Sequence, residues 1–297
     1  MKHWVSAFRL RTLPLALSSI MMGGFLAAAA GAFRWDIFLL CIATTIFLQI
    51  LSNLANDYGD SVHGADSADR KGPSRAVQSG RISPAQMKAG ILVFVLLSLV
   101  SGIGLLFTSF GLNWSAIFFF LGLGVLSILA AIGYTVGKRP YGYAGLGDIS
   151  VFIFFGLVGV MGSLYLFTHQ LSWQYIWPAI SCGVFAVGVL NINNIRDIDS
   201  DRKAGKFSIP VRIGKQNAAL YHWSLVIVGL GSAVAFVAMH FESALQFLFI
   251  LSAPAFLVIS RNIQVKPSHE LDPYLKFMAL STLLFVILFG VGQLVAF

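Results

Sequence analysis

The chain has 297 residues, of which 57% are hydrophobic and only 11% are charged, and its formal net charge is +8. Soluble globular domains carry about 25% charged residues, so this composition excludes a disordered chain and argues against a soluble enzyme. A helix that spans a membrane uses about 20 apolar residues, and nine such helices would leave only short loops here. We therefore expect one all-α integral membrane domain over residues 1–297.

Apolar runs of this length recur along the whole chain. They are apolar on all faces and lack the period-2 alternation of membrane barrel strands, so we expect helices rather than strands. In chain order the predicted spans are residues 13–32, 36–55, 88–109, 114–136, 146–168, 174–195, 219–240, 244–261 and 274–296.

The charges are distributed unevenly about these nine spans. Of the 20 Lys and Arg residues, only Arg34 falls on the second side of the predicted membrane. Lys and Arg mark cytoplasmic loops, so we expect the N-terminus inside and the C-terminus outside. The same bias explains the positive net charge without a nucleic-acid partner.

Of the 12 acidic residues, all but Asp36 and Glu242 share the cytoplasmic side, and this clustering needs a functional explanation.

A first polar motif lies at the end of the second span. Asn53, Asp57 and Asp60 are spaced by four and three residues, which places their side chains on one face of a continuing helix. Carboxylate and amide oxygens suit a hard cation such as Mg²⁺, which is often shared with substrate phosphates. The alternative is a solvated helix end.

A second motif lies at the end of the sixth span. Asn193, Asp197 and Asp201 are each four residues apart and again share one helix face, whereas Asp199 points elsewhere and is expected to be solvated. An Asp-Arg-Lys sequence follows in both cases, at residues 69–71 and 201–203. The recurrence indicates a weak internal repeat, in which each half of the chain contributes one acidic cluster.

Basic residues accompany both motifs. Carboxylates, a metal ion and bases together suit a diphosphate, because metals bridge its oxygens and Arg or Lys neutralises the remaining charge. For any single base, the positive-inside bias is the competing explanation.

Tyr134 and Lys138, four residues apart at the end of the fourth span, are expected to share a helix face. Asp148 opens the fifth span, where it either caps the helix or contacts substrate.

Five stretches of sequence, several of which contain these motifs, carry a resemblance to a known family. They are Arg11–Pro14, Gln49–Asp60, Tyr134–Tyr143, Gly145–Ile149 and Leu190–Asn194. They resemble the UbiA superfamily of intramembrane aromatic prenyltransferases, and within it the branch that uses 1,4-dihydroxy-2-naphthoate in menaquinone biosynthesis. The resemblance implies nine helices in two pseudo-repeated halves around a central cavity, in a bacterial inner membrane. One position departs from the superfamily pattern: its first motif often ends in an acid where this chain has Gly64, and either Asp66 or Asp69 replaces it.

The resemblance also implies an activity. The expected reaction transfers a polyprenyl group from polyprenyl diphosphate to 1,4-dihydroxy-2-naphthoate, with loss of carbon dioxide, to give demethylmenaquinone. The nearer alternative is another aromatic acceptor such as 4-hydroxybenzoate. A more remote alternative is a secondary transporter, which would place its polar residues near mid-membrane, whereas the acids here lie at helix ends.

The expected site combines both motifs with the bases near them. Mg²⁺ is assigned to Asp57, Asp60, Asp197 and Asp201, and these carboxylates act with Tyr134 and Lys138 in catalysis, where Lys138 holds the diphosphate. The remaining predicted substrate-binding residues are Asn53, Asn56, Arg70, Lys71, Arg75, Arg139, Asp148, Asn193 and Arg202.

Overall fold

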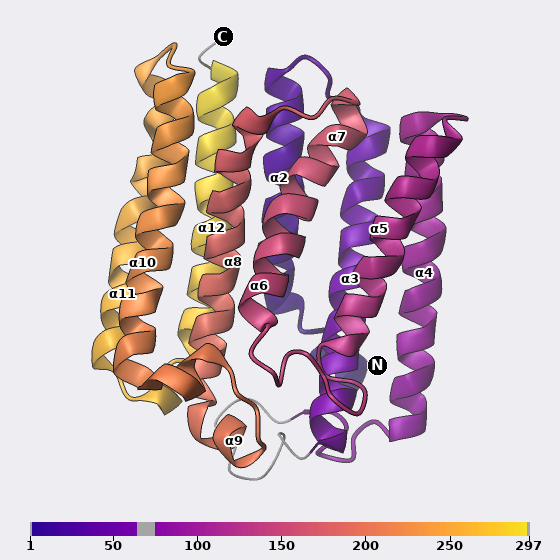
Figure 1. The fold of residues 1–297 in the computed structure, drawn as a ribbon, viewed down its shortest axis with the longest axis vertical. Helices are drawn as coiled ribbons and strands as arrows, with labels where there is room; N and C mark the ends of the chain where they lie inside the picture. The colour runs from indigo at the N-terminus through magenta and orange to yellow at the C-terminus, as the bar shows by residue number, and fades with distance from the viewer. Residues whose placement is uncertain (1, 64–74, 296–297) are drawn as a thin grey trace.

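The computed structural model describes residues 2–63 and 75–295. Within these ranges, nine helical spans are long and apolar enough to cross a membrane, which confirms the expected all-α membrane architecture. The spans stand side by side in one bundle, with the two ends of the chain at opposite ends of it (Figure 1). No strand occurs among the described residues.

The elements follow one another through short connections. The spanning ones are α2 (Leu13–Ala29), α3 (Trp35–Val62), α4 (Pro84–Phe110), α5 (Trp114–Gly133), α6 (Gly147–Val151) continued by the π-helical η2 (Phe152–Gly162) and α7 (Ser163–Thr168), α8 (Ile176–Arg196), α10 (Ile209–Met239), η4 (Ala244–Ser252) continued by α11 (Ala253–Val265), and α12 (Asp272–Val295). The short ones are α1 (Lys2–Phe8), η1 (Leu10–Thr12), η3 (Trp173–Tyr175), α9 (Ile198–Lys203) and η5 (Ser268–Glu270).

Three helix boundaries differ from the sequence-based prediction in ways that affect the site. Helix α3 continues past residue 55 to Val62, which carries the first acidic motif on regular helix. Helix α5 ends at Gly133, before the predicted limit of 136. Helix α10 begins at Ile209 instead of 219, because Pro210 in its first turn has a backbone preorganised for a helix start, and the helix is interrupted at Gly214, where φ is +78°.

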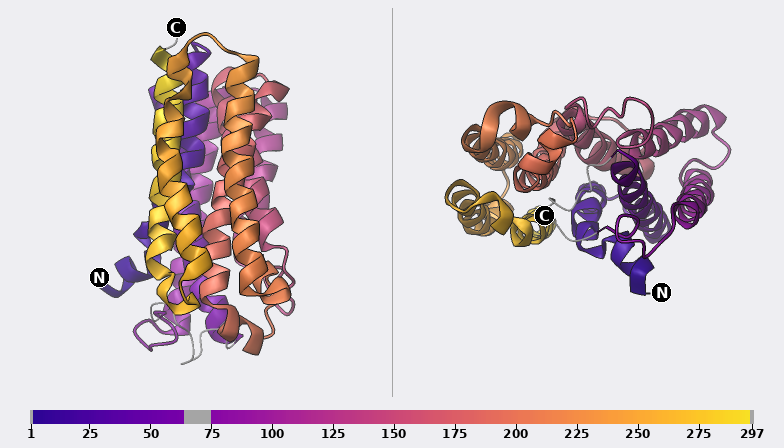
Figure 2. Two further views of the ribbon diagram at one scale, coloured as in Figure 1. Left: turned by 90° about the vertical axis from the view of Figure 1, so that its left-hand side faces the viewer. Right: turned by 90° about the horizontal axis from the view of Figure 1, so that it is seen from below.

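The bundle has two sides with a middle layer between them. Helices α3, α4 and α5 form one side, α8, α10, α11 and α12 form the other, and α2 and the α6–α7 segment lie between (Figures 1 and 2). The last turn of α3 and the α8–α9 junction lie at the same end of the bundle (Figure 1). The fold therefore brings the two acidic motifs to one end, as the even number of crossings between them requires.

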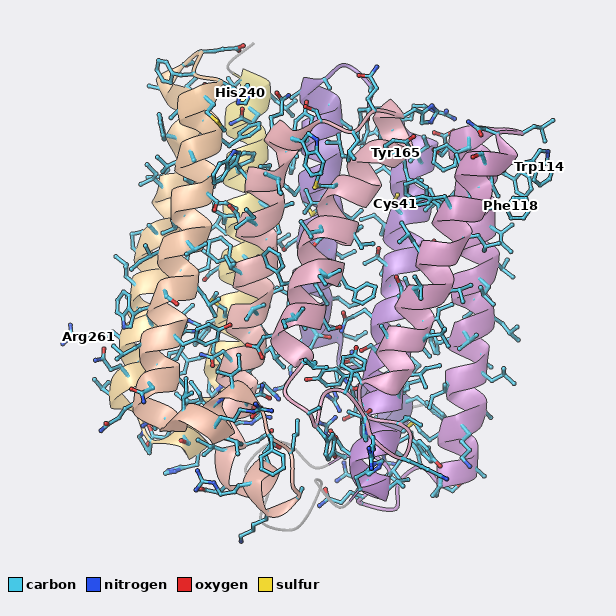
Figure 3. The ribbon with its side chains drawn as sticks, viewed as in Figure 1. Cys41, Trp114, Phe118, Tyr165, His240 and Arg261 are labelled. Carbon is cyan, nitrogen blue, oxygen red and sulfur yellow. The ribbon has the colours of Figure 1, made fainter. Side chains whose placement is uncertain are left out.

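The outer surface of the bundle is apolar. Trp114 and Phe118 on α5 point away from the other helices and are exposed, whereas Cys41 on α3 is buried inside (Figure 3). Large exposed apolar surfaces are unusual on soluble proteins. This surface suits a lipid bilayer as the surrounding solvent.

Glycines allow helices to approach closely inside the bundle, as is common in membrane proteins. Gly290 on α12 packs against the ring of Phe25, and Gly229 on α10 packs against the ring of Phe185. Gly59 lies in the first acidic motif, where a Cβ atom would be 2.5 Å from the carbonyl oxygen of Thr135. This contact holds the end of α3 against the loop that follows α5.

The Gly59 contact predicts a position-specific loss of stability. In Gly59→Ala, the added methyl would meet backbone at Thr135, so α3 and the loop must separate, at an expected cost of about 1–3 kcal/mol. Thermal unfolding of the detergent-purified protein should show a lower midpoint. Gly104→Ala on α4 is the control, because nothing lies within 4 Å of its added Cβ; equal midpoints for the two variants would contradict the prediction.

The nine spans found among the described residues predict that the termini lie on opposite sides of the membrane. With the positive-inside bias, a reporter fused after Phe297 should read as periplasmic in a bacterial host. A fusion in the loop after α8, near Lys203, should read as cytoplasmic. A cytoplasmic signal from the C-terminal fusion would mean that the orientation, or the assignment of a span, is wrong.

Candidate active site

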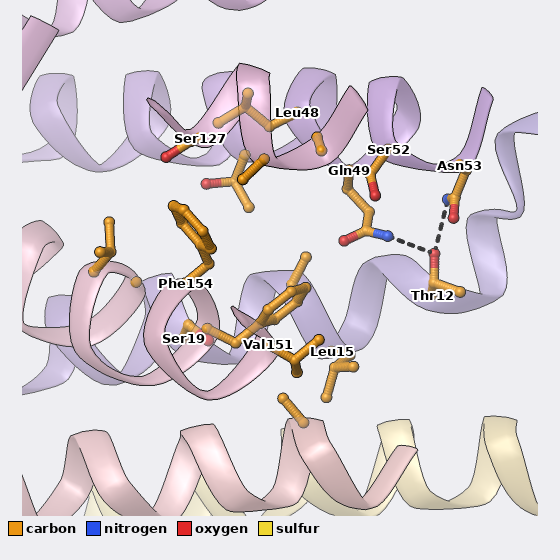
Figure 4. A pocket seen from close by; sticks show the side chains of 18 of the residues that line it. Thr12, Leu15, Ser19, Leu48, Gln49, Ser52, Asn53, Ser127, Val151 and Phe154 are labelled. Atoms are coloured by element: carbon orange, nitrogen blue, oxygen red, sulfur yellow. Dashed lines mark hydrogen bonds between the residues drawn. The ribbon is translucent and has the colours of Figure 1, made fainter. Parts of the chain in front are cut away.

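A cavity of about 450 Å³ lies between the helices and is lined by residues of both acidic motifs. Figure 4 shows part of it: apolar side chains such as Leu48 and Phe154 surround the space, while Thr12, Gln49 and Asn53 lie together toward one end. The cavity thus has a polar end and largely apolar walls beyond it. Such a space suits a molecule with a charged head and a hydrocarbon body.

The N-terminal segment is tied to the polar end by hydrogen bonds. The hydroxyl oxygen of Thr12 accepts bonds from Gln49 Nε2 (3.2 Å) and Asn53 Nδ2 (3.0 Å). Asn53 Nδ2 also donates to the Phe8 carbonyl oxygen at 2.9 Å. Asn53 therefore lines the cavity as predicted, and in this structure its amide fixes α3 to the segment that precedes α2.

The first acidic motif divides its carboxylates between two environments. Asp60 lines the cavity, where it accepts hydrogen bonds from Tyr143 Oη (3.0 Å) and Arg75 Nη2 (3.2 Å). Asp57 is also buried, but both of its oxygens accept backbone N–H bonds, from Ala76 (3.0 Å) and Val77 (3.1 Å). In this structure Asp57 orders the turn after residue 75 and does not line the cavity.

The second motif spans a break between helices. Helix α8 ends at Arg196 and α9 begins at Ile198, yet the backbone bonds Asp197 N–H to Asn193 O (3.1 Å) and Asp201 N–H to Asp197 O (2.8 Å) preserve helical spacing. Asn193, Asp197 and Asp201 all line the cavity. The prediction that these three side chains share one side is confirmed, although the helix is not continuous.

Arg196 stands next to Asp197 within the second motif, and the sequence analysis assigned it no role. Its fully buried guanidinium donates to both oxygens of Asp197, at 2.8 and 2.6 Å, and to Asn193 Oδ1 at 2.8 Å. It also pairs with Asp272 at the start of α12, and Asp272 in turn accepts from Arg11 Nη1 at 3.0 Å. This chain of charges joins α8, α12 and the N-terminal segment.

Lys206 is a second residue that the sequence analysis missed. It follows α9, it is buried, and its Nζ lies 3.5 Å from Asp201 Oδ2. Burial works to lower the pKa of Lys206, but the carboxylates of Asp201 and Asp60 outweigh it and raise that pKa. Burial also raises the pKa of Asp201 to about 6, against the opposing effect of Lys206. Lys206 is therefore a charged ammonium between carboxylates of both motifs.

The predicted pairing of Tyr134 with Lys138 on one helix face is wrong, because α5 ends at Gly133 and the chain then turns away. Tyr134 lines the cavity, and burial raises the pKa of its phenol to about 12. Lys138 is exposed in the loop and is not among the lining residues. Its contact with diphosphate stays a prediction, and Lys206 rather than Lys138 is the lysine of this region that lines the cavity.

The other predicted substrate-binding residues fall into three groups. Asn56 and Arg75 line the cavity. Arg139 and Arg202 are exposed and lie outside its lining, while Asp148 is buried and accepts a hydrogen bond from Tyr221 Oη at 3.2 Å, also outside the lining. Arg70 and Lys71, together with Asp66 and Asp69, lie outside the described residues.

The donor set fits a magnesium ion that is shared with substrate. Within residues 2–63 and 75–295, no three acidic, histidine or cysteine side chains are gathered closely enough to hold a metal unaided. Mg²⁺ in enzymes, however, usually takes one or two carboxylates together with water and substrate phosphates. Asp201 Oδ2 is buried and accepts no hydrogen bond from the described residues, and Asp60 supplies further oxygen from α3.

The chain is similar over most of its length to proteins of known name. The sequence model of the UbiA prenyltransferase family matches residues 16–293. A 1,4-dihydroxy-2-naphthoate octaprenyltransferase of Haemophilus influenzae is 46% identical over 300 aligned residues, which cover 99% of this chain and 96% of that protein. One of Escherichia coli is 46% identical over 271 residues, covering 91% of this chain and 86% of that protein.

Solved structures share the fold. An apo UbiA homologue from Aeropyrum pernix superposes with a TM-score of 0.66 at 20% identity and covers 96% of both chains. A UbiA homologue from Archaeoglobus fulgidus bound to DMAPP and Mg²⁺ gives a TM-score of 0.60 at 16% identity, covering 95% of this chain and 99% of that one. The family match over nearly the whole chain, together with the 46% identity to named relatives, shows that this protein belongs to the UbiA prenyltransferase family.

Proposed function

We propose that this protein transfers a polyprenyl group from polyprenyl diphosphate to 1,4-dihydroxy-2-naphthoate, with loss of carbon dioxide, as a step of menaquinone biosynthesis in a bacterial cytoplasmic membrane. The observation that carries the proposal is the meeting of two acidic motifs, from distant parts of the chain, at the polar end of one largely apolar cavity. The acceptor is taken from the names of the relatives that are 46% identical.

The polar end suits the diphosphate. Arg75 and Lys206 line it beside Asp60 and Asp201, and Arg9 and Arg11 line it from the N-terminal segment. Charge-assisted bonds from Arg and Lys are the strong interactions for phosphate oxygens. Mg²⁺, when bound with the substrate, would supply further positive charge to the departing diphosphate, and Asp60, Asp197 and Asp201 are the carboxylates of the cavity that would hold it.

The apolar walls suit the prenyl chain and protect the reaction. The allylic carbon–oxygen bond breaks with its electron pair leaving on diphosphate, and the electron-rich naphthalene ring supplies the pair for the new carbon–carbon bond. The carboxylate then departs as carbon dioxide and leaves its bonding electrons in the ring, so the immediate product is the quinol. Side chains such as Leu15, Val151 and Phe154 exclude water, which would otherwise capture the allylic cation.

We assign Tyr134 a role at the breaking bond. Its phenol is protonated at neutral pH, as an ordinary tyrosine is, and burial raises its pKa further, to about 12. Its hydroxyl can donate a hydrogen bond to the leaving oxygen, and its ring can face the positive charge that develops on the prenyl group. That Tyr134 lines the cavity supports both roles.

An acceptor assay tests the proposed function. Purified protein in lipid nanodiscs, given octaprenyl diphosphate, 1,4-dihydroxy-2-naphthoate and Mg²⁺, should form the prenylated, decarboxylated product, identified by mass spectrometry. Chelation with EDTA should abolish product formation and excess Mg²⁺ should restore it, because the described residues offer oxygen ligands rather than a Cys or His site. Product from 4-hydroxybenzoate alone would instead favour the alternative acceptor.

The two motifs should be needed for chemistry and not for folding. Asp60→Asn and Asp201→Asn each remove one negative charge from the polar end, and turnover should fall at least about 100-fold, as when a main electrostatic contact to the reacting group is lost. The matched control is Asp199→Asn, because Asp199 is exposed and lies on the same short helix as Asp201. Both variants should remain folded, although each leaves a buried base without its full countercharge and should therefore melt at a lower temperature; near-normal turnover in either site variant would refute the assignment.

A further inference from the structure

Among the described residues, each acidic side chain that lines the cavity has a basic partner within the protein. Asp60 pairs with Arg75 at 3.2 Å, Asp197 with Arg196 at 2.6 Å and Asp201 with Lys206 at 3.5 Å. All six side chains are buried. Buried carboxylates without a partner are costly, so these bases balance the site in the absence of metal and substrate. A divalent cation that binds the same oxygens must compete with them.

Lys206 is held differently from Arg196. The guanidinium of Arg196 makes four hydrogen bonds, to Asn193, Asp272 and both oxygens of Asp197, which fix it in place. The ammonium of Lys206 makes a longer ion pair, and Asp201 Oδ2 accepts no hydrogen bond from the described residues. A lysine carries its charge as a compact group on a flexible four-carbon stem, so this ammonium can move while its backbone stays in place.

Lys206 pairs with the second motif and also lies near the first. Besides Asp201, the carboxylates of Asp60 and Asp197 act electrostatically on its ammonium. The ammonium is 5.8 Å from the ring centre of Tyr143, whose hydroxyl donates to Asp60. One positive charge is thus shared by acids from both halves of the chain. That is the place where a cation bridging the two motifs would bind.

We propose that Lys206 is a stand-in cation: its ammonium holds the position between the motifs in the metal-free protein and moves onto the diphosphate when divalent metal and diphosphate bind together. The inference rests on the proposed function and deepens it. The proposal predicts that metal binding and diphosphate binding are coupled. Metal alone must displace the Lys206 ammonium without offering it a new partner, whereas diphosphate supplies that partner. Diphosphate should therefore strengthen metal binding, and metal should strengthen diphosphate binding by the same factor.

The decisive variant is Lys206→Gln, measured by metal binding without catalysis. Mn²⁺ takes the same oxygen ligands as Mg²⁺, and the free ion can be followed by electron paramagnetic resonance. Removing a unit charge that lies 3.5 Å from Asp201 Oδ2 should make the variant bind Mn²⁺ alone at least about tenfold more tightly than the unmodified protein. The gain in Mn²⁺ affinity on adding inorganic pyrophosphate, corrected for complexes in the buffer, should shrink correspondingly.

Two further variants separate this inference from general effects of charge or folding. Lys206→Arg keeps a positive charge and should keep Mn²⁺ binding weak in the absence of pyrophosphate. Lys266→Gln removes an exposed lysine that pairs with Glu270, and it should change neither measurement. Unchanged or weaker binding of Mn²⁺ alone by Lys206→Gln overturns the proposal, as does equal tightening in Lys266→Gln.

The outcome is separable from that of the proposed function. If the unmodified protein forms the prenylated product but Lys206→Gln binds Mn²⁺ no more tightly, the activity stands and the stand-in role fails. If the unmodified protein binds no Mn²⁺ even with pyrophosphate, both fail. Tighter Mn²⁺ binding together with slower prenyl transfer in Lys206→Gln supports both.

Discussion

Negative charge buried inside a membrane protein is the constraint on which the rest of this structure depends. Asp60, Asp197 and Asp201 are all buried, and burying a charge is costly unless it is paired. The pairing extends beyond the cavity: Arg196 links Asp197 to Asp272, and Asp272 holds Arg11. Because these residues come from α8, α12 and the N-terminal segment, the contacts that neutralise the site also hold that end of the bundle together.

The bilayer explains why so much of the fold could be predicted from sequence. In hydrocarbon a spanning segment must satisfy its own backbone hydrogen bonds, so each long apolar run has to be a helix. Their number then fixes which helix ends share a side. The ends of α3 and α8 are separated by four crossings, and both acidic motifs do reach one cavity. Spacing along a regular helix likewise placed Asp57 and Asp60 on α3.

Prediction failed where the helices stop, because loops obey no spacing rule. Lys138 was expected one turn after Tyr134, but α5 ends at Gly133 and Lys138 is exposed. The lysine that does enter the cavity is Lys206, which follows the helix break at Asp197 and the left-handed turn at Gly205 (φ +71°). Arg196 was overlooked for a related reason: its partner Asp272 lies on another helix, and no short-range pattern reveals such a pair.

The division of the cavity into a charged end and apolar walls determines where chemistry can occur. A polyprenyl diphosphate has a head that requires charge and a tail that requires an apolar surrounding, so the bond that joins them must lie where the two environments meet. Tyr134 lines the same cavity as Lys206 of the charged end and Leu190 of the apolar walls, and we propose that the bond breaks beside it. A cation released there has diphosphate on one side and hydrocarbon on the other. The ring of an acceptor held at the same level is then the favoured nucleophile, because the apolar walls keep water away from the hydrocarbon side of the cation.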